Sequence, residues 1–521
     1  MPNLTKTKSP DVLIRESEAP ERALKRSLSA FDLTCLGVGA TIGTGIFALT
    51  GTAAAGANSA TADKWSTPLI SFIQSWITHA PVDLGRPAAG PAIMISFLVA
   101  AIACGFAALC YAELSAMIPV SGSAYTYSYA TLGEIFAWII GWDLILEYAV
   151  GNMAVAASWS QYFLAFCNSL FGIKFPLWLV TDHGTAQTVI AKGGAALADF
   201  SSTTLPTFAG HTIALNLPAV VIVGLITVLL VRGVRESAHT NTGIVIVKVA
   251  VVVFVIALGG FYVNPSNWVP FAPSGFGGIM GGAAVVFFSY IGFDAVSTAA
   301  EEAKNPKRDM PIGMIASLVI CAVLYVLMSA VLTGMKKYTF FLGDAAPVAT
   351  VFAGNRVVQA VVSAGALAGM TSVLLVFQLG QPRIFMSMAR DGLLPQYFAR
   401  IHPRFRTPHI TTIWTGVIVA SVAMVSSVEK LAELTSIGTL FAFVVVCVGV
   451  CVLRRTSPER ERPFRVPLVP LMPILGILMC FFLMLSLTGD AWLRFFGWLA
   501  IGLAIYFFYG VRHSRLQRGE G

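Results

Sequence analysis

Apolar runs long enough to cross a lipid bilayer recur along the whole chain, with polar or charged residues between them. A transmembrane helix needs about 20 mostly apolar residues, because the hydrocarbon layer is about 30 Å thick. The pattern therefore predicts an all-α polytopic membrane protein with about 12 transmembrane helices. These spans are expected near residues 31–54, 90–118, 135–165, 212–231, 241–263, 276–299, 311–334, 356–379, 410–428, 433–453, 468–488 and 491–511.

The segments outside these spans are unequal in length. Residues 1–29 form a polar N-terminal tail and residues 512–521 a short C-terminal tail. Two connections, about 55–89 and 166–211, are much longer than the others. Within the first, Leu69–Ala80 is amphipathic and is expected to lie on the membrane surface. The alternative is an insertion with no defined role.

The composition excludes several classes of protein. Of 521 residues, 56% are hydrophobic and 12% are charged, about half the charged share of a soluble domain, so a cytosolic enzyme is ruled out. The sequence offers no nucleophile–base pair and no metal-ligand spacing of histidines, so neither an enzyme nor a metal site is expected. It has no GxxxxGK[ST] motif for ATP. Uphill transport would therefore use an ion gradient.

The net charge of +8 would suggest a nucleic-acid partner in a soluble protein. Here the basic residues lie between apolar runs. With the N-terminus in the cytoplasm, 24 of the 34 Lys and Arg residues fall on the cytoplasmic side and nine on the other, while Lys248 lies inside a span. The positive-inside rule therefore predicts that both termini are cytoplasmic. The expected partner is the bilayer of a cell (plasma or inner) membrane, and no nucleic acid.

Two spans contain runs that transmembrane helices usually avoid. Gly37–Gly45 (GVGATIGTG) lies in the first span and Ser289–Asp294 (SYIGFD) in the sixth. Each glycine weakens a helix by about 1 kcal/mol relative to alanine, and a break at mid-membrane frees backbone groups that protein or a polar cavity must satisfy. Broken helices at matching positions of two chain halves indicate a transporter's midplane site. The alternative is that the glycines are helix-packing seams.

The freed backbone groups suit an amino acid. Amides that begin the second half of the first helix, near Gly43, Thr44 and Gly45, would bind a carboxylate at the positive end of the helix dipole. Carbonyls at the ends of the first half-helices would accept hydrogen bonds from an ammonium group. These carbonyls are expected near Ala40, Thr41, Phe288, Ser289 and Ile291.

At these positions the chain resembles the amino acid–polyamine–organocation superfamily, and within it the cationic amino acid transporter branch, as a bacterial-type twelve-helix permease. The resemblance is carried by GVGATIGTGIFALTG at Gly37–Gly51 and by FFSYIGFDAVSTAAEEAKNPKRDMPIGM at Phe287–Met314. Further matches are FAALCYAEL at Phe106–Leu114, PVSGSAYTYSYATLGE at Pro119–Glu134, IGWDLILEYAVG at Ile140–Gly151 and RDGLLP at Arg390–Pro395.

The resemblance implies a five-plus-five inverted repeat with broken helices 1 and 6. The first repeat would cover residues 30–265 and the second 266–453, followed by a basic loop and two more helices over 454–511. Position by position, it implies a carboxylate cradle and an ammonium-binding backbone, with Phe288 as a gate over the substrate. The cradle matches Ile42, Gly43, Thr44 and Gly45, and the ammonium-binding backbone matches Ala40, Phe288, Ser289 and Ile291.

Ionisable residues inside spans are unfavourable and call for a reason. Lys248 would either extend back to the headgroups or lie beside broken helix 1, where the resemblance implies a lysine in proton-coupled relatives. Burial disfavours the charged form of an amine, so Lys248 would be able to take up and release a proton. Glu147 shares a helix face with Asp143. It would pair with a cationic side chain, carry a second proton or bond only to neighbouring helices.

Two further acidic residues have different expected roles. Asp294 follows the helix 6 break, where it would face the basic end of a substrate or cap the second half-helix. Glu113 ends the second span and is expected to form an ion pair near the membrane interface.

The sequence thus predicts a secondary active transporter that takes up L-amino acids by alternating access in symport with protons. Cationic substrates (arginine, lysine, ornithine) are favoured by the branch and by the acidic residues. The alternatives are a broad or neutral amino acid carrier, a proton-independent exchanger and, less favoured, a nutrient receptor on a transporter fold. No cofactor is expected beyond the proton gradient as energy source, and the sequence identifies no accessory subunit.

Overall fold

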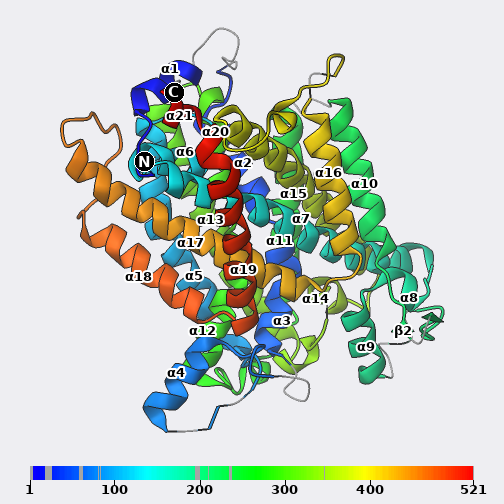
Figure 1. The fold of residues 1–521 in the computed structure, drawn as a ribbon. Helices are drawn as coiled ribbons and strands as arrows, with labels where there is room; N and C mark the ends of the chain where they lie inside the picture. Colours follow the sequence, from blue (N-terminus) through cyan, green and yellow to red (C-terminus); the bar gives the residue numbers. More distant parts are fainter. Residues whose placement is uncertain are drawn as a thin grey trace.

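A bundle of long helices makes up the protein, with short helices and loops at both ends (Figure 1). The computed structural model describes residues 4–17, 26–57, 63–79, 81–82, 84–193, 197, 200–208, 211–233, 238–344, 346–405 and 407–519. Parts of the predicted N-terminal tail and of both long connections lie outside these ranges.

The predicted membrane spans are confirmed. Within the described ranges, eight helices are long and apolar enough to cross a membrane, and a ninth span is a pair of helices bent by 43°. The remaining three predicted spans coincide with shorter apolar helices. In chain order the spans are α2 (Ala30–Thr41), η1 (Gly45–Leu49) and α3 (Thr50–Ala55); η3 (Gly90–Ala92) and α5 (Ile93–Met117); α7 (Glu134–Phe171); α10 (Leu217–Arg232); α11 (Ala238–Gly260); α12 (Gly275–Val286), η6 (Phe287–Tyr290) and η7 (Asp294–Glu302); α13 (Pro306–Met335); α15 (Arg356–Arg390); α16 (His409–Ala423); α17 (Val428–Thr456); α18 (Leu471–Leu485); and α19 (Gly489–Ile505).

Shorter elements occupy the two ends of the bundle. They are α1 (Pro10–Ser17), α4 (Leu69–Thr78), α6 (Ser123–Thr131), α8 (Leu177–Val180), α9 (His183–Lys192), η5 (Pro265–Trp268), η8 (Tyr338–Phe341), α14 (Pro347–Thr350), η9 (Gln396–Ala399), η10 (Tyr506–Gly510), α20 (Val511–His513) and α21 (Arg515–Arg518), with the antiparallel strands β1 (Thr207–Phe208) and β2 (His211–Thr212). Both termini lie at one end, which we call the terminal end, whereas α4, α9 and β2 lie at the other (Figure 1).

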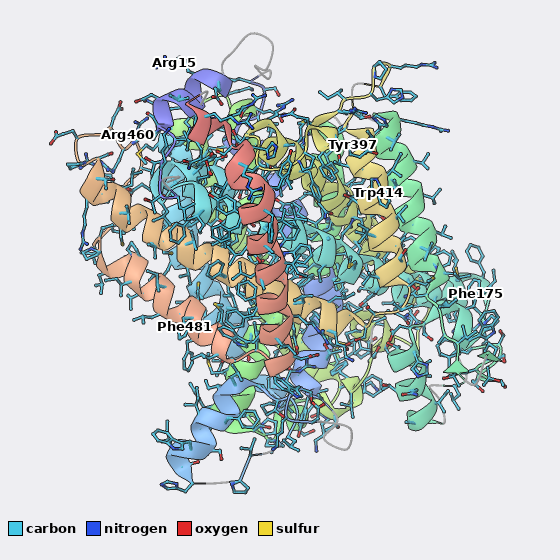
Figure 2. All side chains as sticks on the ribbon, viewed as in Figure 1. Arg15, Phe175, Tyr397, Trp414, Arg460 and Phe481 are labelled. Atoms are coloured by element: carbon cyan, nitrogen blue, oxygen red, sulfur yellow. The ribbon has the colours of Figure 1, made fainter. Side chains whose placement is uncertain are left out.

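Burial separates central from peripheral helices. Helix α7 and the segment from α12 to η7 are almost entirely enclosed, whereas α11 and α19 are mostly exposed along their apolar lengths. Exposed apolar side chains such as Trp414 and Phe481 lie along the sides of the bundle, and charged Arg15 and Arg460 lie at the terminal end (Figure 2). This distribution is that of a bundle whose sides face lipid.

Helix α4 confirms that the amphipathic piece of the first long connection is helical. Its first turn is held against the loop before α19, since Leu69 N donates to Leu487 O over 3.2 Å. On its other face Trp76 is 79% exposed and Ile77 is 64% exposed. Its place on a membrane surface stays a prediction.

The N-terminal segment is bound to the terminal end of the bundle. The Lys8 ammonium donates to Glu16 over 2.9 Å and to Asp391 after α15 over 3.3 Å, and Tyr125 of α6 donates to the same Asp391 over 2.6 Å. Burial acts to lower the pKa of Lys8, but the Asp391 and Glu16 carboxylates outweigh it and raise the pKa above its ordinary value. This lysine is therefore charged at neutral pH.

Glu113 forms the predicted ion pair. It is 1% exposed at the end of α5 and accepts two hydrogen bonds from the Arg454 guanidinium, over 2.8 and 2.6 Å. Arg462, which is also buried, lies 3.4 Å away, and Val466 N donates over 2.7 Å. One carboxylate thus contacts two arginines and fixes the loop between α17 and α18.

Replacing Glu113 with Gln is expected to destabilise the fold. Breaking a buried pair from one side leaves an uncompensated charge, at a cost of about 3 kcal/mol or more. The melting temperature of the detergent-solubilised protein should fall by several degrees. The matched control is Glu461→Gln, whose partner Lys307 is 59% exposed and whose loss should change the melting temperature little. Equal shifts in both variants would contradict this account of Glu113.

Candidate functional site

The break in the first span begins where α2 ends. Ser29 and Asp32 start α2 with reciprocal side-chain-to-backbone hydrogen bonds, an arrangement that stabilises a helix N-terminus. Ile42 then adopts an extended conformation (ψ 101°), and the chain resumes as the π-helix η1 and as α3. Within the described part of the chain, the amides of Gly43, Thr44 and Gly45 donate no backbone hydrogen bond. They are the donors that a resumed helix leaves without an internal partner.

The sixth span breaks in a different way. Helix α12 tightens into the 3₁₀ turn η6, Ile291 is extended (ψ 129°), and Gly292 has φ +122°, which an L side chain rarely adopts. The chain continues as the 3₁₀ helix η7. Asp294, the first residue of η7, accepts a hydrogen bond at Oδ1 from Gly292 N over 3.2 Å, so this carboxylate holds the turn that precedes the second half.

The two breaks contact each other directly. A Cβ atom at Gly45 would lie 2.3 Å from Ser289 Cα, and a Cβ atom at Gly292 would lie 2.8 Å from the Ala40 carbonyl. Glycine is therefore required at both positions for the two unwound segments to cross at this distance. The crossing brings the predicted carboxylate cradle and the predicted ammonium-binding backbone to one place in the buried core.

Lys248 of α11 is buried against the helix 1 break. It is 0% exposed, and its ammonium donates to Gly39 O over 2.6 Å and to Ile42 O over 3.3 Å. Gly369 of α15 lies beside its stem, where a Cβ atom would make an ordinary van der Waals contact at 3.5 Å from Lys248 Cγ. Lys248 thus bonds the last carbonyls of α2 instead of extending to the headgroup region.

Several of the predicted ammonium-binding carbonyls already have partners. Tyr325 of α13 donates to Thr41 O over 2.9 Å, and Ile291 N donates to Phe288 O over 3.2 Å. The Ser289 and Ile291 carbonyls accept no backbone hydrogen bond within the described ranges. The buried hydroxyls of Thr44 and Ser289 likewise have no hydrogen-bond partner there.

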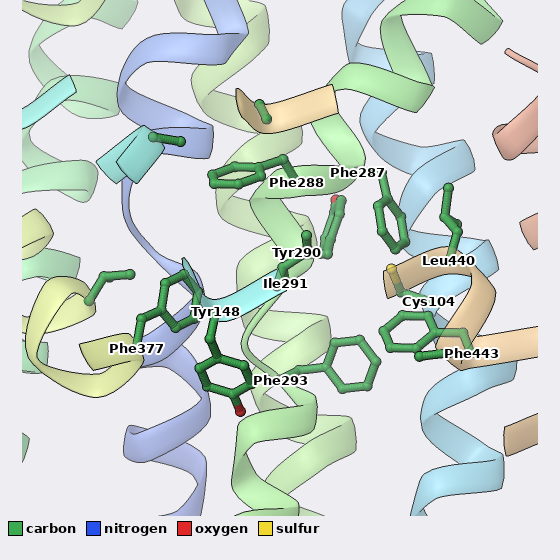
Figure 3. Close-up of a cluster of buried hydrophobic side chains, with 14 of the residues drawn as sticks. Cys104, Tyr148, Phe287, Phe288, Tyr290, Ile291, Phe293, Phe377, Leu440 and Phe443 are labelled. Carbon is green, nitrogen blue, oxygen red and sulfur yellow. The ribbon is translucent and has the colours of Figure 1, made fainter. Parts of the chain in front are cut away.

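Aromatic and aliphatic side chains surround the crossing. Phe288 and Ile291 project from helix 6, and Tyr148 of α7 and Phe377 of α15 lie beside Ile291 (Figure 3). The Tyr148 and Phe377 rings meet edge to face with centroids 5.5 Å apart. Apolar side chains therefore form part of the surroundings of the break.

Two carboxylates lie on the central helix α7. Glu147 is 4% exposed and Asp143 is 2% exposed. Asp143 and Asp294 are both within electrostatic range of the Glu147 carboxyl group. Across the residues that the structure describes, no group of three or more His, Cys, Asp or Glu residues is placed to hold a metal ion.

The sequence did not identify three tyrosines whose hydroxyl groups donate to backbone carbonyls at or near the breaks. Besides Tyr325, Tyr162 of α7 donates to Phe47 O in η1 over 2.6 Å, and Tyr290 donates to Phe97 O of α5 over 2.9 Å. The Tyr325 hydroxyl satisfies a carbonyl that the break at the end of α2 frees, and the other two hydroxyls bond to carbonyls of η1 and α5. The only available signal was the occurrence of tyrosines in otherwise apolar spans.

The amino acid permease family model matches residues 28–505. The chain is 45% identical over 500 residues to the branched-chain amino acid permease BcaP of Bacillus subtilis, covering 96% of each chain. It is 43% identical over 519 residues to the methylthioribose transporter of the same organism, covering 99% of this chain and 100% of the relative. A vacuolar cationic amino acid transporter 4 of Arabidopsis thaliana is 36% identical over 468 residues, covering 88% of this chain and 68% of the relative.

The family match extends over both helix breaks and almost all of the spans, and two relatives match the chain from end to end. The chain therefore belongs to the amino acid permease family of the amino acid–polyamine–organocation superfamily.

Proposed function

We propose that the protein is a secondary active transporter that takes up L-amino acids by alternating access, in symport with protons. The observation that carries the proposal is the crossing of the two helix breaks in the buried core. It gathers amides and carbonyls without a backbone hydrogen bond and two hydroxyls without a partner, as far as the described residues show. Buried polar groups are normally satisfied, so a ligand with both acceptor and donor groups would complete this site.

The backbone of an amino acid supplies those groups. Its carboxylate would accept from the amides of Gly43, Thr44 and Gly45, with Ile42 completing the cradle. Its ammonium would donate to the Ser289 and Ile291 carbonyls, with Ala40, Thr41 and Phe288 as the surrounding backbone. Phe288 would cover the bound molecule as the gate. The membrane would be the plasma membrane, with both termini cytoplasmic as the basic residues predict.

Proton coupling is proposed for Lys248. Its ammonium holds two carbonyls at the end of α2, so loss of its proton would weaken both contacts and release this end of the break. Protonation would then bias helix 1 between two positions, which is how a bound ion couples to a conformational change. Glu147 is proposed as a second proton carrier.

The proposed substrates are neutral amino acids with apolar side chains. This proposal rests on the apolar side chains that lie near the break and on the branched-chain permease and methylthioribose transporter among the relatives. Asp294 supports it, because its carboxylate already accepts from Gly292 N. A cationic substrate is the second candidate, because Glu147 Oε2 is buried and has no partner within the described chain.

The test is uptake of radiolabelled L-leucine and L-arginine into proteoliposomes with an inward proton gradient and no sodium. We expect leucine to accumulate above its external concentration only while the gradient lasts, and unlabelled leucine to compete at least tenfold better than arginine. Stronger competition by arginine would favour the cationic candidate. Accumulation that ignores the proton gradient would contradict proton symport.

A further inference from the structure

The carboxyl group of Asp143 is enclosed by protein and has no hydrogen-bond partner among the residues that the structure describes. Its side chain lies on the central helix α7, is 2% exposed, and both of its oxygens lack a partner within the described part of the chain. One oxygen of Glu147, Oε2, lies one turn further along the same face and also lacks a partner among the described residues. Asp143 is not one of the residues proposed to bind the carboxylate or the ammonium group of the substrate.

The wall opposite Asp143 leaves room for this carboxyl group. A Cβ atom at Gly438 of α17 would lie 2.5 Å from Asp143 Oδ1 and 3.1 Å from Oδ2. The next residue, Thr439, is within hydrogen-bonding reach of Glu147. The two acidic side chains are thus directed at neighbouring positions of one facing helix.

The charges around the pair do not neutralise it. Near Glu147 the other titratable groups are Asp294, Tyr148 of α7 and Tyr111 of α5. Arg383 of α15 is close enough to interact electrostatically with Tyr148. Among the described residues, no lysine or arginine has such an interaction with Asp143 or Glu147. An isolated carboxylate without a partner is so unfavourable in a buried site that it takes up a proton instead.

We propose that Asp143 is a proton-binding residue that passes protons between Glu147 and the terminal end of the protein; this inference rests on the proposed proton symport. Asp143 is about 6 Å along α7 from Glu147 at 1.5 Å per residue, on the side of the terminal end. A proton leaves the Glu147 carboxyl group and reaches the Asp143 carboxylate through a bridging water molecule, and bulk water receives it when the site opens to that side. Each transfer moves one proton, and no other bond forms or breaks.

The test compares two modes of transport in proteoliposomes containing wild type or Asp143→Asn. Asparagine imitates the protonated acid but cannot release a proton. Counterflow exchanges labelled for unlabelled amino acid with no net proton movement, so we expect the variant to keep at least half of the wild-type counterflow rate. Gradient-driven accumulation should fall at least tenfold. A pH-sensitive dye inside the vesicles should show the same loss of substrate-driven proton entry.

The other outcomes are equally informative. Wild-type accumulation in Asp143→Asn would overturn the inference, because it would mean that Asp143 stays protonated throughout the cycle. Accumulation that requires sodium would also overturn the inference, because Asp143 and Glu147 would then bind a metal cation instead of a proton. If Asp143→Asn does not fold, the same comparison is made with Asp143→Ser. Failure of both neutral variants to fold would overturn the inference, because Asp143 would then serve only to pack α7 against α17. Failure of the proposed function is separate, because wild type itself would then show counterflow without gradient-driven accumulation.

Discussion

Replacing Lys248 with Met is expected to abolish proton-driven accumulation while leaving counterflow measurable. Methionine fills most of the volume of the lysine stem beside Gly369 but can neither bind a proton nor donate to the Gly39 and Ile42 carbonyls. Accumulation in proteoliposomes should fall at least tenfold. Two carbonyls would also lose their partner, at about 1–3 kcal/mol for a buried group left unsatisfied, so the melting temperature should fall by several degrees.

Lys8→Met is the matched control. Lys8 is also buried, at 5% exposed, but its carboxylate partners lie at the terminal end. Its replacement should lower stability without removing the dependence of uptake on the proton gradient. If Lys248→Met accumulates substrate as wild type does, Lys248 is a structural lysine and the protein is a facilitator or an exchanger.

Much of the fold follows from the length of the apolar runs, because only helices satisfy their own backbone within a span. The predicted positions therefore coincide with the observed helices, including the shorter α10, α16 and α18. The 3₁₀ winding of η7 was not predictable, since its sequence DAVSTAAEE does not exclude an α-helix. It follows the Gly292 turn and packs against α2 and α13, which are surroundings that the local sequence does not specify.

The location of the site was predictable because glycines in the middle of an apolar span mark a place where backbone groups are freed. The hydrogen-bond partners of the individual groups at the site were less predictable. Sequence left Asp294 as either a substrate contact or a helix cap, whereas in the structure its carboxylate accepts from Gly292 N in the turn before η7. That direction of the side chain has no signal in the sequence. The partners of the Thr41 and Phe47 carbonyls come from α13 and α7, far away in the sequence. Such long-range pairs leave no local pattern.

Replacing Gly45 with Ala is expected to abolish transport in both directions. The added methyl group would lie 2.3 Å from Ser289 Cα, and backbone cannot move aside as a flexible side chain can. The two breaks would be forced apart, so the amides of helix 1 and the carbonyls of helix 6 would no longer fit one amino acid. Overpacking costs about 1–3 kcal/mol, so the variant should fold with a lower melting temperature. Its counterflow rate should fall at least a hundredfold.

Gly105→Ala in α5 is the matched control, because a Cβ there would meet nothing within 4 Å. Alanine favours a helix by about 1 kcal/mol over glycine, so this variant should transport normally and melt no lower than wild type. Comparing the two variants separates the contact between the breaks from the general effect of alanine for glycine. Wild-type counterflow in Gly45→Ala would show that substrate does not bind between closely crossed breaks. Lys248 would then bond to a helix end that forms no part of the binding site. Protonation of Lys248 would therefore have no physical route by which to drive substrate transport.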